Sequence, residues 1–115
     1  MYSFNYNRVK LVNDAVAAIG KSDDAKLLAG GQSLVASMKL RLSKPSDLID
    51  LGTIAELQGI KVEGSTVTIG AMTRHAEVAG SAEVKKAIPA LAELAGGIGD
   101  RQVRNMGTIG GSVAN

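Results

Sequence analysis

The sequence places a pair of glycines and a small hydroxyl residue directly after a short apolar run. Leu27 and Leu28 lead into Ala29-Gly30-Gly31-Gln32-Ser33, and Leu34 begins an apolar pattern with helical spacing. Glycines reach positive φ and allow close approach, so consecutive backbone N–H groups can converge there on an anion. The following helix adds unpaired donors, and Ser33 could cap that helix or donate its hydroxyl to a phosphate oxygen. The stretch predicts a phosphate-binding loop, although a plain turn between strand and helix fits the same residues.

A second glycine pair lies near the end of the chain. Thr108 and Ser112 flank Gly110 and Gly111 with hydroxyls, which predicts another oxyanion cradle. The surrounding segment, 98–115, is polar and then glycine-rich, without a helical or alternating pattern, so we expect it to be irregular. Its charged residues are expected to form a local ion pair among Asp100, Arg101 and Arg104.

Residue types that support metal or nucleophilic chemistry are scarce. The absence of cysteine excludes disulfides, thiolate metal sites and iron–sulfur ligation on this chain. The single histidine, His75, has no partner at ligand spacing, so we expect no metal site and assign His75 a surface or capping role. Neither the Gly-Lys-Ser/Thr of a P-loop nor Gly-x-Gly-x-x-Gly at the strand–helix junction is present. Two glycine-plus-hydroxyl loops suit a diphosphate held from both sides, and the lack of catalytic residues indicates a cofactor that itself reacts.

The composition is that of an ordinary globular domain. The chain has 115 residues, 45% of them hydrophobic and 21% charged, with a net charge of +2. Aromatic residues amount to only 3%, so the stacking rings and basic groove of a nucleic-acid-binding protein are not expected. No apolar run is long enough for a membrane span, and the N-terminus lacks the layout of a signal peptide. We therefore expect a cytoplasmic protein that binds no nucleic acid.

The elements that must position the first loop follow a β-α-β-α-β order, which favours parallel pairing and right-handed crossovers. The first element is a strand in which Tyr2, Phe4 and Tyr6 alternate as core or edge residues, and a helix over 9–19 that Gly20 ends follows it. A strand over 26–29 leads to a helix from Ser33 that buries Leu34, Met38 and, if it is long enough, Leu42. The last element is a strand over 47–51. The basic residues after the second helix are expected to be a solvated face of Lys39, Arg41 and Lys44.

The pattern changes after Gly52. Alternating apolar residues predict a hairpin over 60–69. Three short helices follow: one capped by Thr73, one that begins near Ser81, and one that begins at Pro89 and ends at Gly96-Gly97. The third helix is expected to bury Ile88, Leu91, Ala92 and Ala95.

Both glycine motifs resemble those of a known family. Ala29-Gly30-Gly31-Gln32-Ser33 and Thr108-Ile109-Gly110-Gly111-Ser112 are similar to the two FAD-binding motifs of the flavoprotein (medium) subunit of molybdenum hydroxylases. Medium subunits of aerobic carbon monoxide dehydrogenase are the nearest members, and xanthine dehydrogenase carries an equivalent domain. The similarity runs from about Phe4 to the last residue, and further matching stretches are 38–42, 48–51, 69–73 and 102–105.

The resemblance implies an α+β fold of the PCMH/vanillyl-alcohol-oxidase type, α/β-like in its N-terminal part. Residues 1–52 would form the N-terminal FAD-binding subdomain and residues 53–115 the beginning of the second. Both loops would grip the FAD pyrophosphate, with glycines that let the backbone approach, hydroxyls of Ser33 and Thr108 on phosphate oxygens, and Ile98 at the flavin. The implied FAD-binding positions are Ala29, Gly30, Gly31, Gln32, Ser33, Leu34, Ile98, Thr108, Ile109, Gly110, Gly111 and Ser112.

The same resemblance implies partners. An iron–sulfur subunit that serves a molybdopterin subunit would deliver electrons, and FAD would pass them to an acceptor such as quinone or NAD. No catalytic or metal-binding residue is expected on this chain, and its lack of cysteine agrees with clusters on a partner.

Two departures from the family pattern bear on these expectations. Ser112 stands where many members have Asn, and family members continue well past residue 115. We therefore expect weakened FAD affinity, and uncovered strand edges that favour self-association. Two alternatives stay open: a module that binds no cofactor and serves assembly, and simple nucleotide binding without redox work.

Overall fold

The computed structural model describes residues 1–115, which divide into two compact units, Met1–Ala55 and Glu56–Asn115. We call these the first unit and the second unit. Each contains its own sheet and its own helices. None of the helices has both the length and the apolar character that crossing a membrane requires.

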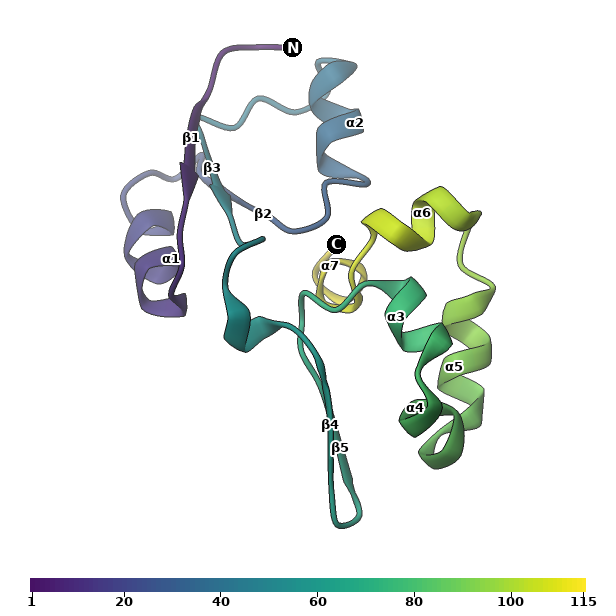
Figure 1. The fold of residues 1–115 in the computed structure, drawn as a ribbon. Helices are drawn as coiled ribbons and strands as arrows, with labels where there is room; N and C mark the ends of the chain where they lie inside the picture. Colours follow the sequence, from purple (N-terminus) through teal and green to yellow (C-terminus); the bar gives the residue numbers. More distant parts are fainter. The chain divides into compact units, whose positions relative to one another are not determined.

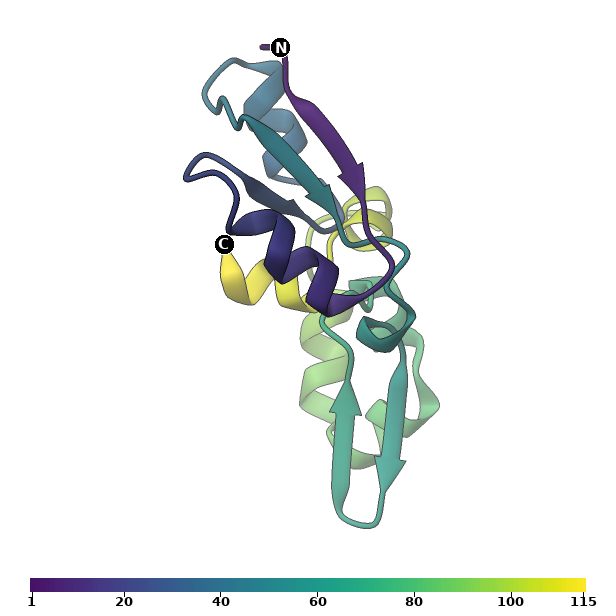
Figure 2. The same cartoon turned by 90° about the vertical axis from the view of Figure 1, so that its left-hand side faces the viewer.

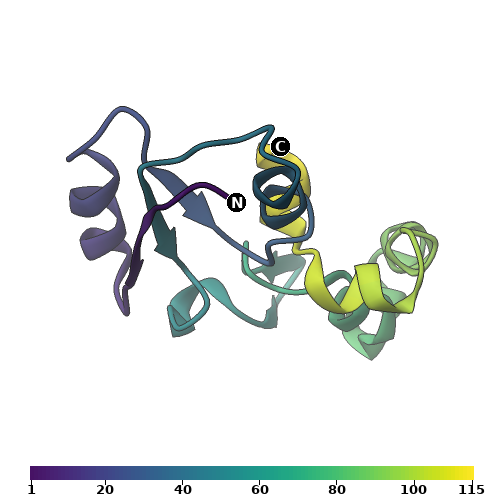
Figure 3. The same ribbon diagram turned by 90° about the horizontal axis from the view of Figure 1, so that it is seen from above.

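The first unit is built around a parallel three-stranded sheet. Strands β1 (Asn5–Arg8), β2 (Lys26–Leu28) and β3 (Asp47–Asp50) lie in the order β1-β3-β2. The predicted β-α-β-α-β order and parallel pairing are confirmed. Helices α1 (Val12–Ile19) and α2 (Leu34–Lys39) lie on opposite faces of this sheet (Figures 1 and 3). Opposite faces follow from the strand order, because two right-handed crossovers that run in opposite directions place their helices on opposite sides.

The central strand β3 supplies the apolar centre of the first unit. Ile49 pairs with Asn7 of β1 and Leu27 of β2, and both Leu48 and Ile49 are buried. Successive strand residues point to opposite faces, so this pair buries one side chain on each face of the sheet. Met38 of α2 is buried as predicted.

The second unit combines a hairpin with short helices. Strands β4 (Ile60–Glu63) and β5 (Thr66–Ile69) are antiparallel and turn at Gly64, whose φ of 60° is left-handed (Figure 2). They are preceded by the 3₁₀ turn η1 (Ala55–Leu57) and followed by α3 (His75–Gly80), α4 (Ala82–Ala87) and α5 (Pro89–Gly96). The buried cluster of this unit is Val78, Val84, Ala92 and Ala95, with Ile60, Ile69, Ala79 and Leu91 packed against it.

Several helix boundaries agree with the predictions. Gly20 is the C-cap of α1, Ser81 caps α4 by accepting the Val84 N–H at 3.2 Å, and Pro89 opens α5. Thr73, in contrast, caps no helix: the N-cap of α3 is Arg74. The Thr73 hydroxyl is fully buried and is used elsewhere, since it accepts the Gly59 N–H at 3.1 Å and lies 3.2 Å from the Gly59 carbonyl.

The prediction of an irregular tail is wrong. Residues 98–115 contain α6 (Arg101–Met106) and α7 (Ile109–Ala114). Each helix begins at a side-chain cap: Asp100 accepts the Val103 N–H at 2.9 Å, and Thr108 accepts the Gly111 N–H at 3.1 Å. The predicted ion pair of Asp100 is also absent, because Arg104 donates instead to the carbonyls of Ile98 and Gly99.

Some apolar and aromatic side chains are less buried than predicted. Their exposed fractions are 41% for Tyr2, 52% for Tyr6, 78% for Leu42 and 43% for Ile88. Tyr6 points its hydroxyl at a carboxylate, and Leu42 lies beyond the end of α2. The predicted solvated face is confirmed for Lys39, Arg41 and Lys44, the last two over the Tyr2 ring at 5.4 and 5.2 Å.

Candidate functional site

The first glycine loop joins β2 to α2 at the carboxyl edge of the parallel sheet. Gly31 has a left-handed φ of 79°, and a Cβ there would lie 2.9 Å from Cγ2 of Val35. Both the backbone conformation and the close approach of α2 therefore require glycine at this position. The sequence run Ala29–Leu34 thus folds as a tight turn held against the first residues of α2.

The backbone donors of this loop have no acceptor within the protein. The N–H groups from Gly30 to Leu34 form no hydrogen bond, and the first amide that does is Val35, which donates to the Gly31 carbonyl at 3.1 Å. Ser33 is the N-cap of α2 without a side-chain cap bond, and both Gln32 and Ser33 are exposed. Consecutive unpaired amides beside exposed polar side chains form a donor set that suits a phosphate group.

The second glycine motif has a different backbone. The Ile109 N–H donates to the Thr73 carbonyl at 3.0 Å, and the Gly110 N–H donates to the Ala71 carbonyl at 2.8 Å. The Gly111 N–H donates to Thr108 Oγ1, and the backbone N–H of Ser112 donates to the Thr108 carbonyl at 3.1 Å. The four amides from Ile109 to Ser112 therefore already have acceptors, in contrast to those of the first loop.

A separate segment, Ala71–His75, holds the second motif in place. Arg74 and Thr108 form an isolated antiparallel bridge, and a Cβ on Gly110 would lie 2.7 Å from Cβ of Ala71. Gly110 is thus needed for close packing of α7 on this segment. Thr108 is 2% exposed and its oxygen is used as a helix cap, so the predicted contact of its hydroxyl with phosphate stays a prediction.

His75 belongs to this arrangement, although the sequence predicts a surface or capping role for it. The predicted surface position is wrong, because His75 is 4% exposed and its Nε2 lies 2.9 Å from Oγ of Ser112. Its backbone N–H also donates to the Gly107 carbonyl at 3.1 Å. Spacing along the sequence could not reveal this pair, since 37 positions separate the two residues.

Ile98 lies in the turn between α5 and α6 of the second unit. It is partly buried, and its carbonyl accepts Nη1 of Arg104 at 3.3 Å. The structure thus groups Ala29–Leu34 in one loop of the first unit and Thr108–Ser112 at the start of α7 in the second unit. The proposed role of Ile98 at a flavin stays a prediction.

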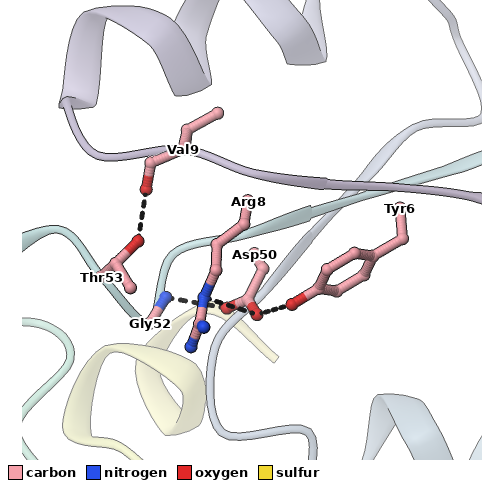
Figure 4. Close-up of polar contacts among 6 residues, drawn as sticks. All are labelled: Tyr6, Arg8, Val9, Asp50, Gly52 and Thr53. Carbon is pink, nitrogen blue, oxygen red and sulfur yellow. Dashed lines mark hydrogen bonds and ion pairs between the residues drawn. The ribbon is translucent and has the colours of Figure 1, made fainter.

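A polar cluster at the end of β3 fixes the edge of the first unit's sheet (Figure 4). Asp50 is 8% exposed, and its carboxylate accepts the Tyr6 hydroxyl and the Gly52 N–H, the latter at 2.8 Å. Arg8 Nε lies 3.6 Å from the same carboxylate, and Thr53 Oγ1 donates to the Val9 carbonyl at 2.9 Å. The hydrogen bond to Asp50, followed by burial and the Asp50 charge, raises the pKa of Tyr6 above its ordinary value. These contacts indicate a structural tie between β1, β3 and the following turn.

The chain is thus an α+β structure in which each of the two units carries one glycine motif, and the first motif has unpaired backbone amides. The chain belongs to the family described as the FAD binding domain in molybdopterin dehydrogenase, which matches residues 2–115. This membership confirms the predicted resemblance, and similarity to a solved structure at a TM-score of 0.96 confirms the predicted fold class.

Relatives of this chain include medium chains of carbon monoxide dehydrogenase. The chain is 53% identical to that of Hydrogenophaga pseudoflava over 97% of its own length and 39% of the relative. It is 47% identical to that of Afipia carboxidovorans over 98% of its own length and 40% of the relative. The solved structure of the Hydrogenophaga pseudoflava enzyme that lacks the Mo-pyranopterin moiety matches with a TM-score of 0.96 at 53% identity, over 98% of this chain and 40% of that chain. The chain thus spans about two fifths of the length of the relatives it matches.

Proposed function

We propose that this chain is the FAD-binding part of a medium subunit of a molybdopterin-dependent dehydrogenase of the carbon monoxide dehydrogenase or xanthine dehydrogenase type. The observation that carries the proposal is the run of amides from Gly30 to Leu34 without an acceptor, at a loop whose shape requires glycine. Family membership over residues 2–115 supports the choice of FAD among phosphate-containing ligands.

The residues of this chain would bind and orient the cofactor. Amides of the first loop would donate to the diphosphate, and the exposed side chains of Gln32 and Ser33 would add donors beside them. In the second motif the amides from Ile109 to Ser112 are occupied, so its contribution would come from glycine surfaces and from hydroxyls. FAD, when bound, supplies the electron chemistry, and the chain provides no catalytic acid or base of its own.

The complex that contains this chain would carry electrons from iron–sulfur clusters of one partner subunit, which serves a molybdopterin subunit, to an acceptor such as quinone or NAD. Two observations support this assignment. The chain has no cysteine to bind a cluster itself, and its relatives are medium chains of multi-subunit dehydrogenases. We also propose a cytoplasmic location and no contact with nucleic acid, which agrees with the modest net charge of +2.

A titration with FAD tests the binding proposal. Flavin fluorescence or calorimetry would measure the dissociation constant for the chain and for Gly31→Ala, with Gly64→Ala as a matched control. Both glycines have a left-handed φ, but a Cβ at Gly64 meets nothing within 4 Å and lies in the β4–β5 turn. We expect Gly64→Ala to lose about 1 kcal/mol of stability, Gly31→Ala to lose more because its Cβ also meets Val35, and only Gly31→Ala to weaken FAD binding, by about tenfold or more.

Two results would contradict this proposal. One is a wild-type chain that is folded by circular dichroism and binds no FAD, which would favour an assembly role. The other is equal FAD affinity in wild type and Gly31→Ala. Equal competition by ADP would instead indicate nucleotide binding without selectivity for the flavin.

A further inference from the structure

His75 is a buried titratable side chain that the proposed function does not yet use. It is 4% exposed, and its one side-chain hydrogen bond joins Nε2 to Oγ of Ser112 at 2.9 Å. The partner is the exposed last residue of the second glycine motif. The hydrogen bond satisfies the buried ring nitrogen and at the same time joins His75 to a motif residue.

His75 contacts the motif segment at both ends. Its backbone N–H donates to the Gly107 carbonyl at 3.1 Å, just before the N-cap of α7, and its ring reaches Ser112 within the helix. A Cβ on Gly107 would lie 3.0 Å from Cδ2 and 3.4 Å from Nε2 of the imidazole. The missing side chain of Gly107 therefore leaves the space in which the ring lies against the backbone.

The Ser112 hydroxyl is the exposed hydrogen-bond donor that this motif still has available. The amides from Ile109 to Ser112 all have acceptors, and Thr108 is buried. A hydroxyl has one hydrogen, and phosphate oxygens only accept. If the imidazole accepts from Ser112, that hydrogen is consumed, whereas if Nε2–H donates to Oγ, the hydrogen is available to a ligand.

We propose that His75 is a positioning residue for the second motif. The imidazole donates its Nε2–H to Ser112 Oγ and so directs the Ser112 hydroxyl hydrogen to a phosphate oxygen of FAD. This inference rests on the proposed function for the identity of the ligand. The pairing itself is a property of the chain without ligand.

The first test is the tautomer of His75, read from ¹⁵N chemical shifts of the imidazole in the chain without FAD. The chain has one histidine, so the signals need no assignment among several rings. We expect the neutral ring to carry its proton on Nε2, and we expect the Nε2 signal to shift in Ser112→Ala. A ring protonated on Nδ1, with Nε2 bare, would overturn the proposal.

The second test compares FAD dissociation constants of variants that fold by circular dichroism. Met at position 75 fills the space without a hydrogen bond, whereas Gln places an N–H donor near the position of Nε2. We expect His75→Met and Ser112→Ala each to weaken FAD binding about three- to tenfold, the double variant to be no weaker than the worse single variant, and His75→Gln to bind nearly as wild type.

The results of these tests distinguish a positioning role of His75 from a purely structural one. Equal losses in His75→Gln and His75→Met, additive losses in the double variant, or unchanged affinity in Ser112→Ala would each show a merely structural histidine and overturn the proposal. If His75→Met does not fold, the tautomer and Ser112→Ala decide. A folded wild type that binds no FAD would contradict the proposed function, while the tautomer, measured without FAD, would still decide the pairing.

Discussion

At the level of single residues, the two glycine motifs use their backbones differently. The amides from Gly30 to Leu34 have no acceptor, and the side chain of Ser33, the N-cap of α2, accepts none of them. The amides from Ile109 to Ser112 are consumed by Thr108 and by the carbonyls of Ala71 and Thr73. Similar residue types thus yield unpaired backbone amides in the first motif and hydrogen-bonded backbone amides in the second.

Tyr6 offers a prediction at this scale. Its pKa is raised chiefly by the hydrogen bond to Asp50, so the folded state favours the neutral phenol. The stabilisation is fully present below the ordinary tyrosine pKa of about 10 and is lost as the pH rises through the higher pKa of the folded state. In a Tyr2→Phe variant, where Tyr6 is the remaining tyrosine, we expect the ultraviolet absorbance of tyrosinate to appear at higher pH than in the same variant unfolded in urea.

The control is Asp50→Asn in the same Tyr2→Phe background, which removes the carboxylate charge. The upward shift of the Tyr6 pKa should shrink there. A Tyr6 that ionises at the same pH in the folded and unfolded chain would show that the contact with Asp50 does not persist in solution.

At the level of elements, short helices depend on what closes their ends. Helix α2 ends in a Schellman arrangement, in which the Leu42 N–H donates to the Ser37 carbonyl at 2.9 Å and the Arg41 N–H donates to the Met38 carbonyl at 3.0 Å. Arg41 has a φ of 58°, at the position where glycine is usual. It is the one residue other than glycine with positive φ in the chain.

Replacement of Arg41 tests whether the left-handed backbone at the end of α2 costs stability. We expect Arg41→Gly to raise the free energy of unfolding by about 0.5 to 1 kcal/mol, because relief of the left-handed strain outweighs the lost contact with the Tyr2 ring. Urea denaturation would measure the change. Arg41→Ala is the matched control: it loses the cation and keeps the strain, so it should give no gain. Stabilisation by Ala equal to that by Gly would contradict the explanation.

At the level of the whole molecule, each unit has its own apolar centre. Leu48 and Ile49 are buried on β3 of the first unit, and the cluster around Val84 consists of residues of the second unit. Relatives carry this chain's sequence over about two fifths of their length. The names of those relatives therefore describe longer proteins, and FAD binding by the glycine loops of this chain is a proposal.

A substitution that creates a cavity tests whether the buried cluster of the second unit is a packed core. Val84 is fully buried, so Val84→Ala should lower the free energy of unfolding by about 2 kcal/mol and speed amide hydrogen exchange in α3, α4 and α5. Val113→Ala, at a side chain that is 84% exposed, should change stability by no more than about 0.5 kcal/mol. Equal effects of the two substitutions would show that the cluster is not a packed core in solution.

Local signals explain which elements were predicted. Ser81, Pro89 and Gly20 act within one turn of their own positions, so the boundaries of α4, α5 and α1 were visible in the sequence. The tail was missed because α6 and α7 lack an apolar stripe and depend on side-chain caps and on pairing with a distant segment. The prediction that Thr73 caps a helix is wrong because its hydroxyl bonds to Gly59, a contact that no local sequence pattern indicates.

The sequence by itself determined the family, the parallel β-α-β-α-β order and the two glycine motifs, because these depend on residue types and short spacings. Only the tertiary structure decided which motif keeps its amides unpaired and which residue holds Ser112. Those properties depend on hydrogen bonds between segments more than thirty positions apart, such as the 37 positions between His75 and Ser112. A sequence states which groups exist, but whether a donor is already used depends on which distant acceptor the fold brings to it.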